Sequence, residues 1–144
     1  MPHQPKVLIV DDDVNILSAF EGFLKAEHCT MIACTNADDA LQTLGAQRVQ
    51  LVISDVRLKN KSGVTLLIRI RQLYPTLPVI VITGHPYLIT ERDIRLCGAS
   101  YYFLKPFELD KLRDAVRKCL HLSSEKHHPY PPHKNIHHQP EDQL

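Results

Sequence analysis

Short apolar runs alternate five times with longer segments in which apolar residues recur at helical spacing. The runs occupy residues 7–10, 30–34, 51–53, 79–82 and 101–104. Two of them are rich in Val and Ile without polar alternation, as strands covered on both faces are. Five strand–helix repeats indicate parallel strands joined by right-handed helical crossovers. The sequence therefore predicts an α/β fold: one doubly wound, five-stranded parallel sheet with five helices.

Residues at the ends of the periodic segments agree with this pattern. Asn36 is placed to cap the second helix, and Gly98 follows the fourth helical segment as a stop signal. Apolar periodicity ends near Leu122. The remaining residues, 123–144, are rich in proline and histidine and have no apolar period. We therefore expect one folded domain over residues 1–122 and a disordered His/Pro-rich tail over residues 123–144.

The composition argues against several classes of function. The chain has 144 residues and a formal net charge of +1, so no strong field directs it to nucleic acid or to a membrane surface. Its apolar runs are too short to span a bilayer, and its N-terminus lacks a secretory signal. The four cysteines form no CxxC pair, which favours reduced thiols. We expect a cytoplasmic protein that binds neither nucleic acid nor membranes directly.

Polar residues follow the predicted strands, at positions where their side chains could lie close together. Three carboxylates, Asp11, Asp12 and Asp13, follow the first run, and Asp55 follows the third. The fourth and fifth runs are followed by a hydroxyl and an ammonium, from Thr83 and Lys105. The carboxyl ends of parallel strands form the functional edge of an open sheet. If the first and third strands are neighbours, the acids share one pocket, which suits Mg²⁺ or Mn²⁺.

Each of these residues also has an ordinary structural interpretation. Asp13 is best explained as a helix cap, and for Asp11 and Asp12 a capping role is about as well supported as a metal-binding one. Taken alone, Asp55 would be a loop acid. The combination at four strand ends favours a functional site. Without a metal ion, repulsion among Asp11, Asp12 and Asp55 is expected to raise the pKa of at least one of them.

Four motifs, "LIVDDD", "VISDVRLKNKSG", "VIVITG" and "GASYYFLKPF", occur in this order along the chain. Together they resemble the response-regulator receiver domain of two-component phosphorelay signalling. The resemblance covers about residues 6–120. It implies a flavodoxin-like sheet with the strand order 2-1-3-4-5. It also implies a cis peptide bond between Lys105 and Pro106, which is plausible because the second residue is proline.

The resemblance implies a role for each motif residue. Asp55 matches the phospho-acceptor, and Lys105 matches the lysine of the family pattern. Mg²⁺, with Mn²⁺ as the other candidate, would be held by Asp12, Asp55 and the backbone carbonyl of Arg57, and by Asp11 through water. Two further pairs complete the set: Thr83 and Tyr102 as the switch, and Arg57 and His85 as residues that tune the lifetime of the phosphate.

The expected partner is a sensor histidine kinase or a phosphotransfer protein that carries a phosphohistidine. The output partner is unknown and would bind the face formed by the fourth helix, the fifth strand and the fifth helix. A homodimer that forms on phosphorylation is a further expectation. On this interpretation the chain is a signalling domain and not an enzyme, apart from self-phosphotransfer and autodephosphorylation.

Two other functions remain open at this point. A haloacid-dehalogenase-type, Mg²⁺-dependent phosphatase also uses an aspartate nucleophile, but it needs a second Asp where this chain has Arg57, and no insertion could form a cap. The chain could also be the receiver fragment of a DNA-binding transcription regulator, although the tail contains no recognition helix. One departure from the receiver pattern lies after the acceptor, where Leu58 is followed by Lys59 instead of proline, while Gly63 keeps its place.

Overall fold

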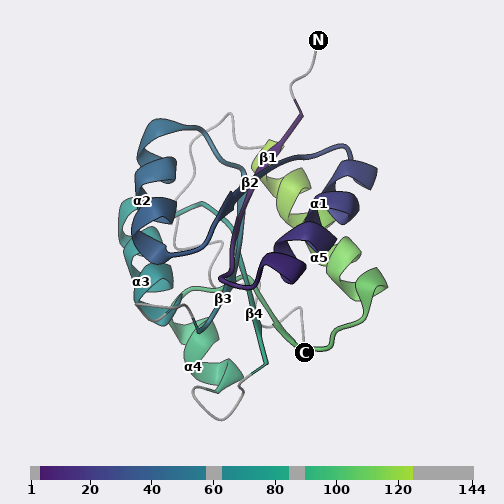
Figure 1. Ribbon diagram of the computed structural model, residues 1–144. Helices are drawn as coiled ribbons and strands as arrows, with labels where there is room; N and C mark the ends of the chain where they lie inside the picture. The colour runs from purple at the N-terminus through teal and green to yellow at the C-terminus, as the bar shows by residue number, and fades with distance from the viewer. Residues whose placement is uncertain (1–3, 58–62, 85–89, 125–144) are drawn as a thin grey trace.

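The computed structural model describes residues 4–57, 63–84 and 90–124, with ten regular elements in strict β–α alternation. Figure 1 shows the strands as a central layer with helices on both sides. The strands are β1 (Lys6–Val10), β2 (Thr30–Cys34), β3 (Leu51–Asp55), β4 (Val79–Thr83) and β5 (Tyr101–Leu104). The helices are α1 (Val14–Ala26), α2 (Ala37–Ala46), α3 (Gly63–Leu73), α4 (Glu91–Leu96) and α5 (Leu109–Ser124).

All five strands are parallel and lie in the order β2-β1-β3-β4-β5. Both the parallel sheet and its strand order are therefore as predicted. The order reverses between β1 and β3, because the chain first adds β2 on one side of β1 and then β3 on the other. In open α/β sheets, the crevice at such a reversal is the usual position of a functional site.

Each face of the sheet has its own apolar core. Helices α1 and α5 cover one face, and α2, α3 and α4 cover the other (Figure 1). Every residue of β3 and β4 is buried, which explains why their sequences do not alternate. Full burial of one aliphatic side chain contributes roughly 1.5–3 kcal/mol, so this double burial fixes the central strands.

Several helix ends match the sequence signals. The Asn36 side chain accepts a hydrogen bond from the Asp39 N–H and caps α2, and Asp13 accepts one from Asn15 and caps α1. Gly98, just beyond α4, has a φ of 108°, in the region that favours glycine. The predicted caps at Asn36 and Asp13 and the stop at Gly98 are confirmed.

Some boundaries differ from the prediction. Asp55 and Thr83 are the last residues of β3 and β4 and do not follow them, because Asp55 still pairs with Ile82 and Thr83 with Leu104. Helix α5 continues to Ser124, two residues beyond the expected domain end. The tail from residue 125 onward lies outside the described residues.

Two predictions from composition concern described residues. Among the helices that the structure describes, none is long and apolar enough to cross a membrane. Cys29, Cys34 and Cys119 are buried and Cys97 is half-buried, and all four are free thiols. The expected reduced cysteines are therefore present, mostly inside the core.

Candidate functional site

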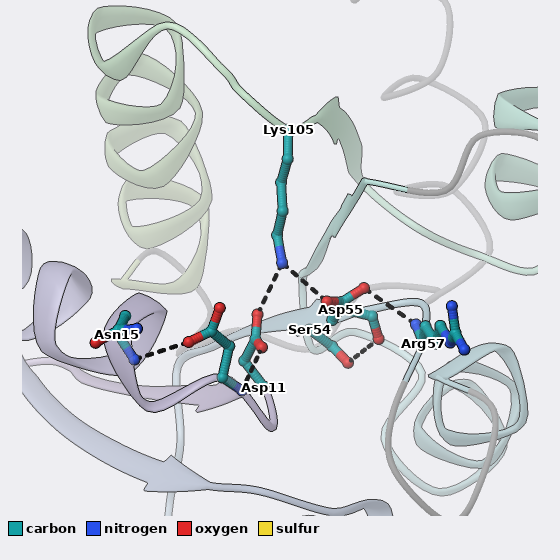
Figure 2. A network of polar contacts seen from close by, with 7 residues as sticks. Asp11, Asn15, Ser54, Asp55, Arg57 and Lys105 are labelled. Carbon is teal, nitrogen blue, oxygen red and sulfur yellow. Dashed lines mark hydrogen bonds and ion pairs between the residues drawn. The ribbon is translucent and has the colours of Figure 1, made fainter.

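The register between β1 and β3 brings two carboxylates together. Val10 pairs with Ser54, so the next residues, Asp11 and Asp55, lie side by side at the carboxyl ends of these strands. Both are buried, with exposed fractions of 4% and 8%. Figure 2 shows their carboxylates turned toward the same point. This is the first part of the predicted site, and the sheet order produces it directly.

Lys105 joins these two carboxylates from the other side of the crevice. It follows β5, and its ammonium donates to Oδ2 of Asp11 at 3.1 Å and to Oδ2 of Asp55 at 2.9 Å. The side chain descends between them in Figure 2. Its peptide bond to Pro106 is cis, as the resemblance implied. The ammonium therefore compensates part of the negative charge collected at this edge.

The remaining oxygens of the two carboxylates are held by backbone donors. Oδ1 of Asp11 accepts from the N–H of Asp13 at 2.9 Å, and Oδ1 of Asp55 accepts from the N–H of Arg57 at 3.0 Å. In each carboxylate, one oxygen thus accepts a hydrogen bond from the backbone N–H two residues further along the chain, and the other accepts one from Lys105. This arrangement fixes the orientation of both side chains before any ligand binds.

The environment changes the pKa of two groups in the site. Burial raises the pKa of Asp11, against the opposing effects of the Asp13 N–H and the Lys105 charge, while the Asp55 charge is the smallest cause. Burial lowers the pKa of Lys105, but hydrogen bonds and attraction to Asp55 and Asp11 outweigh it, so this pKa is raised. A raised carboxyl pKa was predicted from repulsion, so the direction is confirmed, whereas the main cause is burial.

Asp12 does not join this pair. Its side chain is exposed, and among the described residues no three acidic, histidine or cysteine side chains are grouped closely enough to hold a metal ion. Asp12 therefore lies outside the contact that Asp11 and Asp55 share with Lys105, and its role as a metal ligand stays a prediction. Neighbouring residues point in different directions where the chain leaves the strand: Asp11 turns inward to Lys105 and Asp13 caps α1.

A metal ion still fits the chemistry of this edge. Two buried carboxylates against one ammonium leave a net negative charge, and a third carboxylate, Asp12, lies next in the chain at the surface. The available donors are oxygen atoms, which hard divalent cations such as Mg²⁺ prefer. The oxygen donors at this edge are therefore of the kind that a divalent cation such as Mg²⁺ prefers.

Thr83 and Tyr102 lie on adjacent strands beside this crevice. Thr83 is fully buried at the end of β4, and its carbonyl accepts a hydrogen bond from the Lys105 N–H at 2.8 Å. Tyr102, in β5, is half-buried and packs against the core on the α2–α3–α4 face. Burial and the negative charge of Glu91 raise its pKa. Of the two predicted switch residues, Thr83 therefore lies beside Lys105 and Tyr102 lies beside α4.

Gly63, the first residue of α3, lies against the end of β3. Its N–H donates to the Val56 carbonyl at 2.6 Å, and a Cβ at this position would overlap the carbonyl oxygen of Asp55. Only glycine therefore allows α3 to begin so close to Asp55. The Arg57 side chain is exposed. His85, the other residue expected to tune the phosphate lifetime, lies outside the described residues.

Ser54 is a site residue that sequence analysis missed. Its hydroxyl donates to the carbonyl oxygen of Asp55 at 3.0 Å and is buried (Figure 2). The available signal was a hydroxyl inside an otherwise apolar strand, since buried polar groups require partners. Ser54 therefore supports the backbone of Asp55 from within β3.

Comparison with known proteins gives a consistent family. Residues 7–117 match the response regulator receiver domain. Sporulation initiation phosphotransferase F from Bacillus subtilis is 31% identical over 119 residues, which cover 83% of this chain and 96% of that protein. The DNA-binding transcriptional regulator NtrC from Proteus hauseri is 32% identical over 114 residues, which cover 79% of this chain. The match spans only 24% of NtrC, so this chain corresponds to about a quarter of that relative.

Solved structures give the same result. The crystal structure of a CheY-like response regulator receiver domain protein from Methanospirillum hungatei has a TM-score of 0.77 at 25% identity and covers 85% of this chain and 98% of that one. The receiver domain of NtrX from Brucella abortus has a TM-score of 0.74 at 32% identity and covers 80% and 98%.

Proposed function

Because the chain belongs to the response regulator receiver domain family, we propose that it accepts a phosphoryl group on Asp55. The donor would be a phosphohistidine on a sensor histidine kinase or a phosphotransfer protein. The observation that supports this most strongly is the position of the Asp55 carboxylate. It lies at the carboxyl end of the central strand and shares the ammonium of Lys105 with Asp11.

In the proposed transfer, one carboxylate oxygen of Asp55 attacks the phosphorus atom of the phosphohistidine and forms a P–O bond. The P–N bond of the donor breaks, and its electron pair stays on the imidazole nitrogen. The Arg57 N–H keeps the nucleophile oriented through its 3.0 Å hydrogen bond. Lys105, 2.9 Å from Asp55, would donate to an oxygen of the transferred group. Positioning and charge compensation supply most of the catalysis in phosphoryl transfer.

Asp11, Asp12, Asp55 and the backbone carbonyl of Arg57 are the groups that would hold Mg²⁺, with Mn²⁺ as a substitute. The bound ion would neutralise charge on the phosphoryl oxygens. The net negative charge around Asp11 and Asp55 supports this assignment. The exposed side chain of Asp12 could complete the donor set by turning toward Asp11.

The proposed readout begins at Thr83. Its hydroxyl would bind an oxygen of the phosphorylated Asp55, and Tyr102 would then take a different position, which amounts to a population shift between two states. Arg57 and His85, each two residues beyond a functional residue, would control access of the water that hydrolyses the acyl phosphate. Autodephosphorylation and self-phosphotransfer are the only chemical activities proposed.

The output surface would be the face formed by α4, β5 and α5. A groove of about 510 Å³ lies there, lined by α4 and α5 residues and by β5. An unidentified output protein, or a second copy after phosphorylation, would bind this face. We place the protein in the cytoplasm, where a kinase would meet it, without direct binding to nucleic acid or membranes.

Of the two alternative functions, the phosphatase is less well supported, and the regulator fragment would use the same chemistry at Asp55. A haloacid-dehalogenase-type phosphatase is not favoured, since Arg57 replaces the required general acid and the family match is to receivers. Similarity to NtrC supports the idea that this receiver could serve a DNA-binding regulator. The chemistry proposed for Asp55 is the same in that case.

Phosphotransfer from phosphorylated histidine kinases tests this function. The parent, Asp55→Asn and Asp13→Asn proteins are each mixed with kinases whose histidine carries a labelled phosphate. We expect label to leave one kinase and enter the parent and Asp13→Asn, but not Asp55→Asn. Label in Asp55→Asn would contradict the assignment.

A further inference from the structure

Ser54 carries a buried hydroxyl with apolar residues on both sides. Its partners across the sheet are Val10 in β1 and Val81 in β4. All three residues are buried, and Ser54 is 4% exposed. Burying a hydroxyl among apolar groups costs free energy unless the hydroxyl forms a hydrogen bond. An apolar residue would therefore suit this position better if packing were the only requirement.

The partner of this hydroxyl is the backbone of the proposed acceptor itself. The Ser54 hydroxyl donates to the carbonyl oxygen of Asp55 at 3.0 Å (Figure 2). A buried backbone carbonyl also requires a hydrogen-bond donor, so each of the two groups satisfies the other. The hydrogen bond thus holds the main chain of Asp55 rather than its carboxylate.

The Asp55 carbonyl also lies against the first residue of α3. A Cβ on Gly63 would overlap this carbonyl oxygen, and the Gly63 N–H donates to the next carbonyl, that of Val56, at 2.6 Å. The peptide that joins Asp55 to Val56 is therefore held from two elements, by Ser54 in β3 and by the start of α3. Its orientation is fixed at the point where the strand ends.

This peptide leads directly to the group that orients the nucleophile. The Arg57 N–H donates to Oδ1 of Asp55 at 3.0 Å, while Oδ2 accepts from Lys105 at 2.9 Å. Arg57 lies two residues beyond the acceptor, so a rotation of the intervening peptide would move its N–H away from Oδ1. The ammonium of Lys105 is at the end of a flexible side chain and constrains the carboxylate less. The Ser54 hydroxyl therefore acts on the carboxylate through the backbone.

We propose that Ser54 is a positioning residue for phosphorylation: its hydroxyl holds the peptide after Asp55 so that the Arg57 N–H orients the carboxylate toward the incoming phosphorus. The inference rests on the proposed function and adds a residue on which the rate of that reaction depends. Without the hydroxyl, the buried carbonyl of Asp55 lacks this donor, and the peptide rotates to reach another. The carboxylate then adopts the attacking geometry less often, which lowers the rate of P–O bond formation.

The test compares Ser54→Ala with Ser100→Ala, the same chemical change at the amino-terminal edge of the sheet. The Ser100 hydroxyl accepts from the Val79 N–H at 3.4 Å, just before β5 begins. In the unphosphorylated protein without Mg²⁺, amide exchange at Arg57 should be about tenfold faster in Ser54→Ala than in the parent. Ser54→Thr, which keeps a hydroxyl, and Ser100→Ala should both match the parent. Parent-like exchange at Arg57 in Ser54→Ala would overturn the positioning role without any reference to phosphate.

The second measurement is the rate of phosphorylation by a small phosphodonor at saturating Mg²⁺, well below the melting temperature of each variant. A small donor needs no docking surface, so its rate reports on the acceptor. We expect Ser54→Ala to react about tenfold more slowly than the parent, and Ser54→Thr and Ser100→Ala to react at the rate of the parent. A parent-like rate in Ser54→Ala, or an equal loss in Ser54→Thr, would overturn the role of the hydroxyl.

Failure of this inference and failure of the proposed function give different results. If no phosphoryl adduct forms on the parent, the proposed function fails and the effect of Ser54 on its rate with it, while exchange at Arg57 still tests whether the hydroxyl holds the peptide. If the parent is phosphorylated and Ser54→Ala reacts equally fast, only the role of Ser54 fails.

A second variant covers the case in which Ser54→Ala does not fold. Ser54→Cys then takes its place, because a thiol is of similar size and is a much weaker hydrogen-bond donor. Slower phosphorylation and faster exchange at Arg57 are expected there too, and parent-like values would overturn the role of the hydroxyl.

Discussion

The ammonium of Lys105 lies 2.9 Å from Oδ2 of Asp55, although fifty positions separate the two residues in the chain. The same ammonium contacts Asp11. Lys105 thus stabilises the unphosphorylated site by compensating two buried carboxylates, and it already stands where a transferred phosphoryl group would need a cation. Stability and proposed function therefore depend on one side chain.

Lys105→Met should lower the free energy of unfolding by about 2 kcal/mol at pH 7, since it leaves two buried carboxylates without their cation. The loss should shrink in acid, where Asp11, whose pKa is raised by burial, becomes protonated. It should also shrink above pH 10.5, because the raised pKa of Lys105 means that its contribution is lost as pH rises through the folded value. Urea unfolding across pH measures this. Lys111→Met, which removes an exposed ion pair, is the control, and an equal loss there would contradict the account.

Asp11 should leave its own signature in the pH dependence of stability. Its folded pKa is raised above 3.8, so the unfolded chain releases this proton first. Stability should therefore fall as pH rises from 3.8 through the folded value and then level off. Asp11→Asn lacks this group, so the difference in unfolding free energy, parent minus variant, should decrease across that interval. An increase with pH would show that Asp11 is stabilised as a carboxylate.

Mg²⁺ should stabilise the parent by mass action, by about 2.7 kcal/mol at a hundredfold excess over Kd. Asp12→Asn should bind the ion more weakly, because it removes a proposed ligand and leaves the Asp11–Lys105–Asp55 contacts in place. Asp13→Asn is the matched control, since Asp13 caps α1 and should leave Mg²⁺ affinity unchanged. Melting curves of each protein with and without Mg²⁺ measure how much the ion stabilises it. If Asp12→Asn behaves like the parent, Asp12 is not a ligand.

Thr83→Ala should still accept phosphate, but the response of Tyr102 should weaken, because the proposed reader is the hydroxyl and not the methyl group. Thr83 is fully buried, so Thr83→Ser serves as the variant that keeps the hydroxyl. The measurement is the change in Tyr102 side-chain NMR signals on phosphorylation. A full response in Thr83→Ala, or an equal loss in both variants, would remove the hydroxyl from the mechanism.

The pattern of apolar runs predicted all five strands because apolar residues gather where a strand is covered. Strands β1, β3 and β4 are almost wholly buried, and the edge strands β2 and β5 are partly buried. The capping roles of Asn36 and Asp13 were predicted because side-chain oxygens at helix starts satisfy free backbone donors. The strand order came from the family resemblance. Given that order, the meeting of Asp11 and Asp55 followed from the register.

Other features left no readable signal in the sequence. The outward turn of Asp12 depends on loop geometry, which adjacent identical residues do not reveal. The main cause of the raised pKa of Asp11 is burial, which depends on packing around the crevice. Arg71 donates to the backbone carbonyl of Gly98, and any residue type supplies such a carbonyl.

The site of phosphorylation tests the central claim most directly. The parent and Asp55→Asn proteins are incubated with Mg²⁺ and a small-molecule phosphodonor, and the adduct is mapped by mass spectrometry. A single phosphoryl group on Asp55 of the parent, and none on Asp55→Asn, is the predicted result. An adduct on Asp13 or on a histidine, or an Asp55→Asn protein that still becomes labelled, would contradict it.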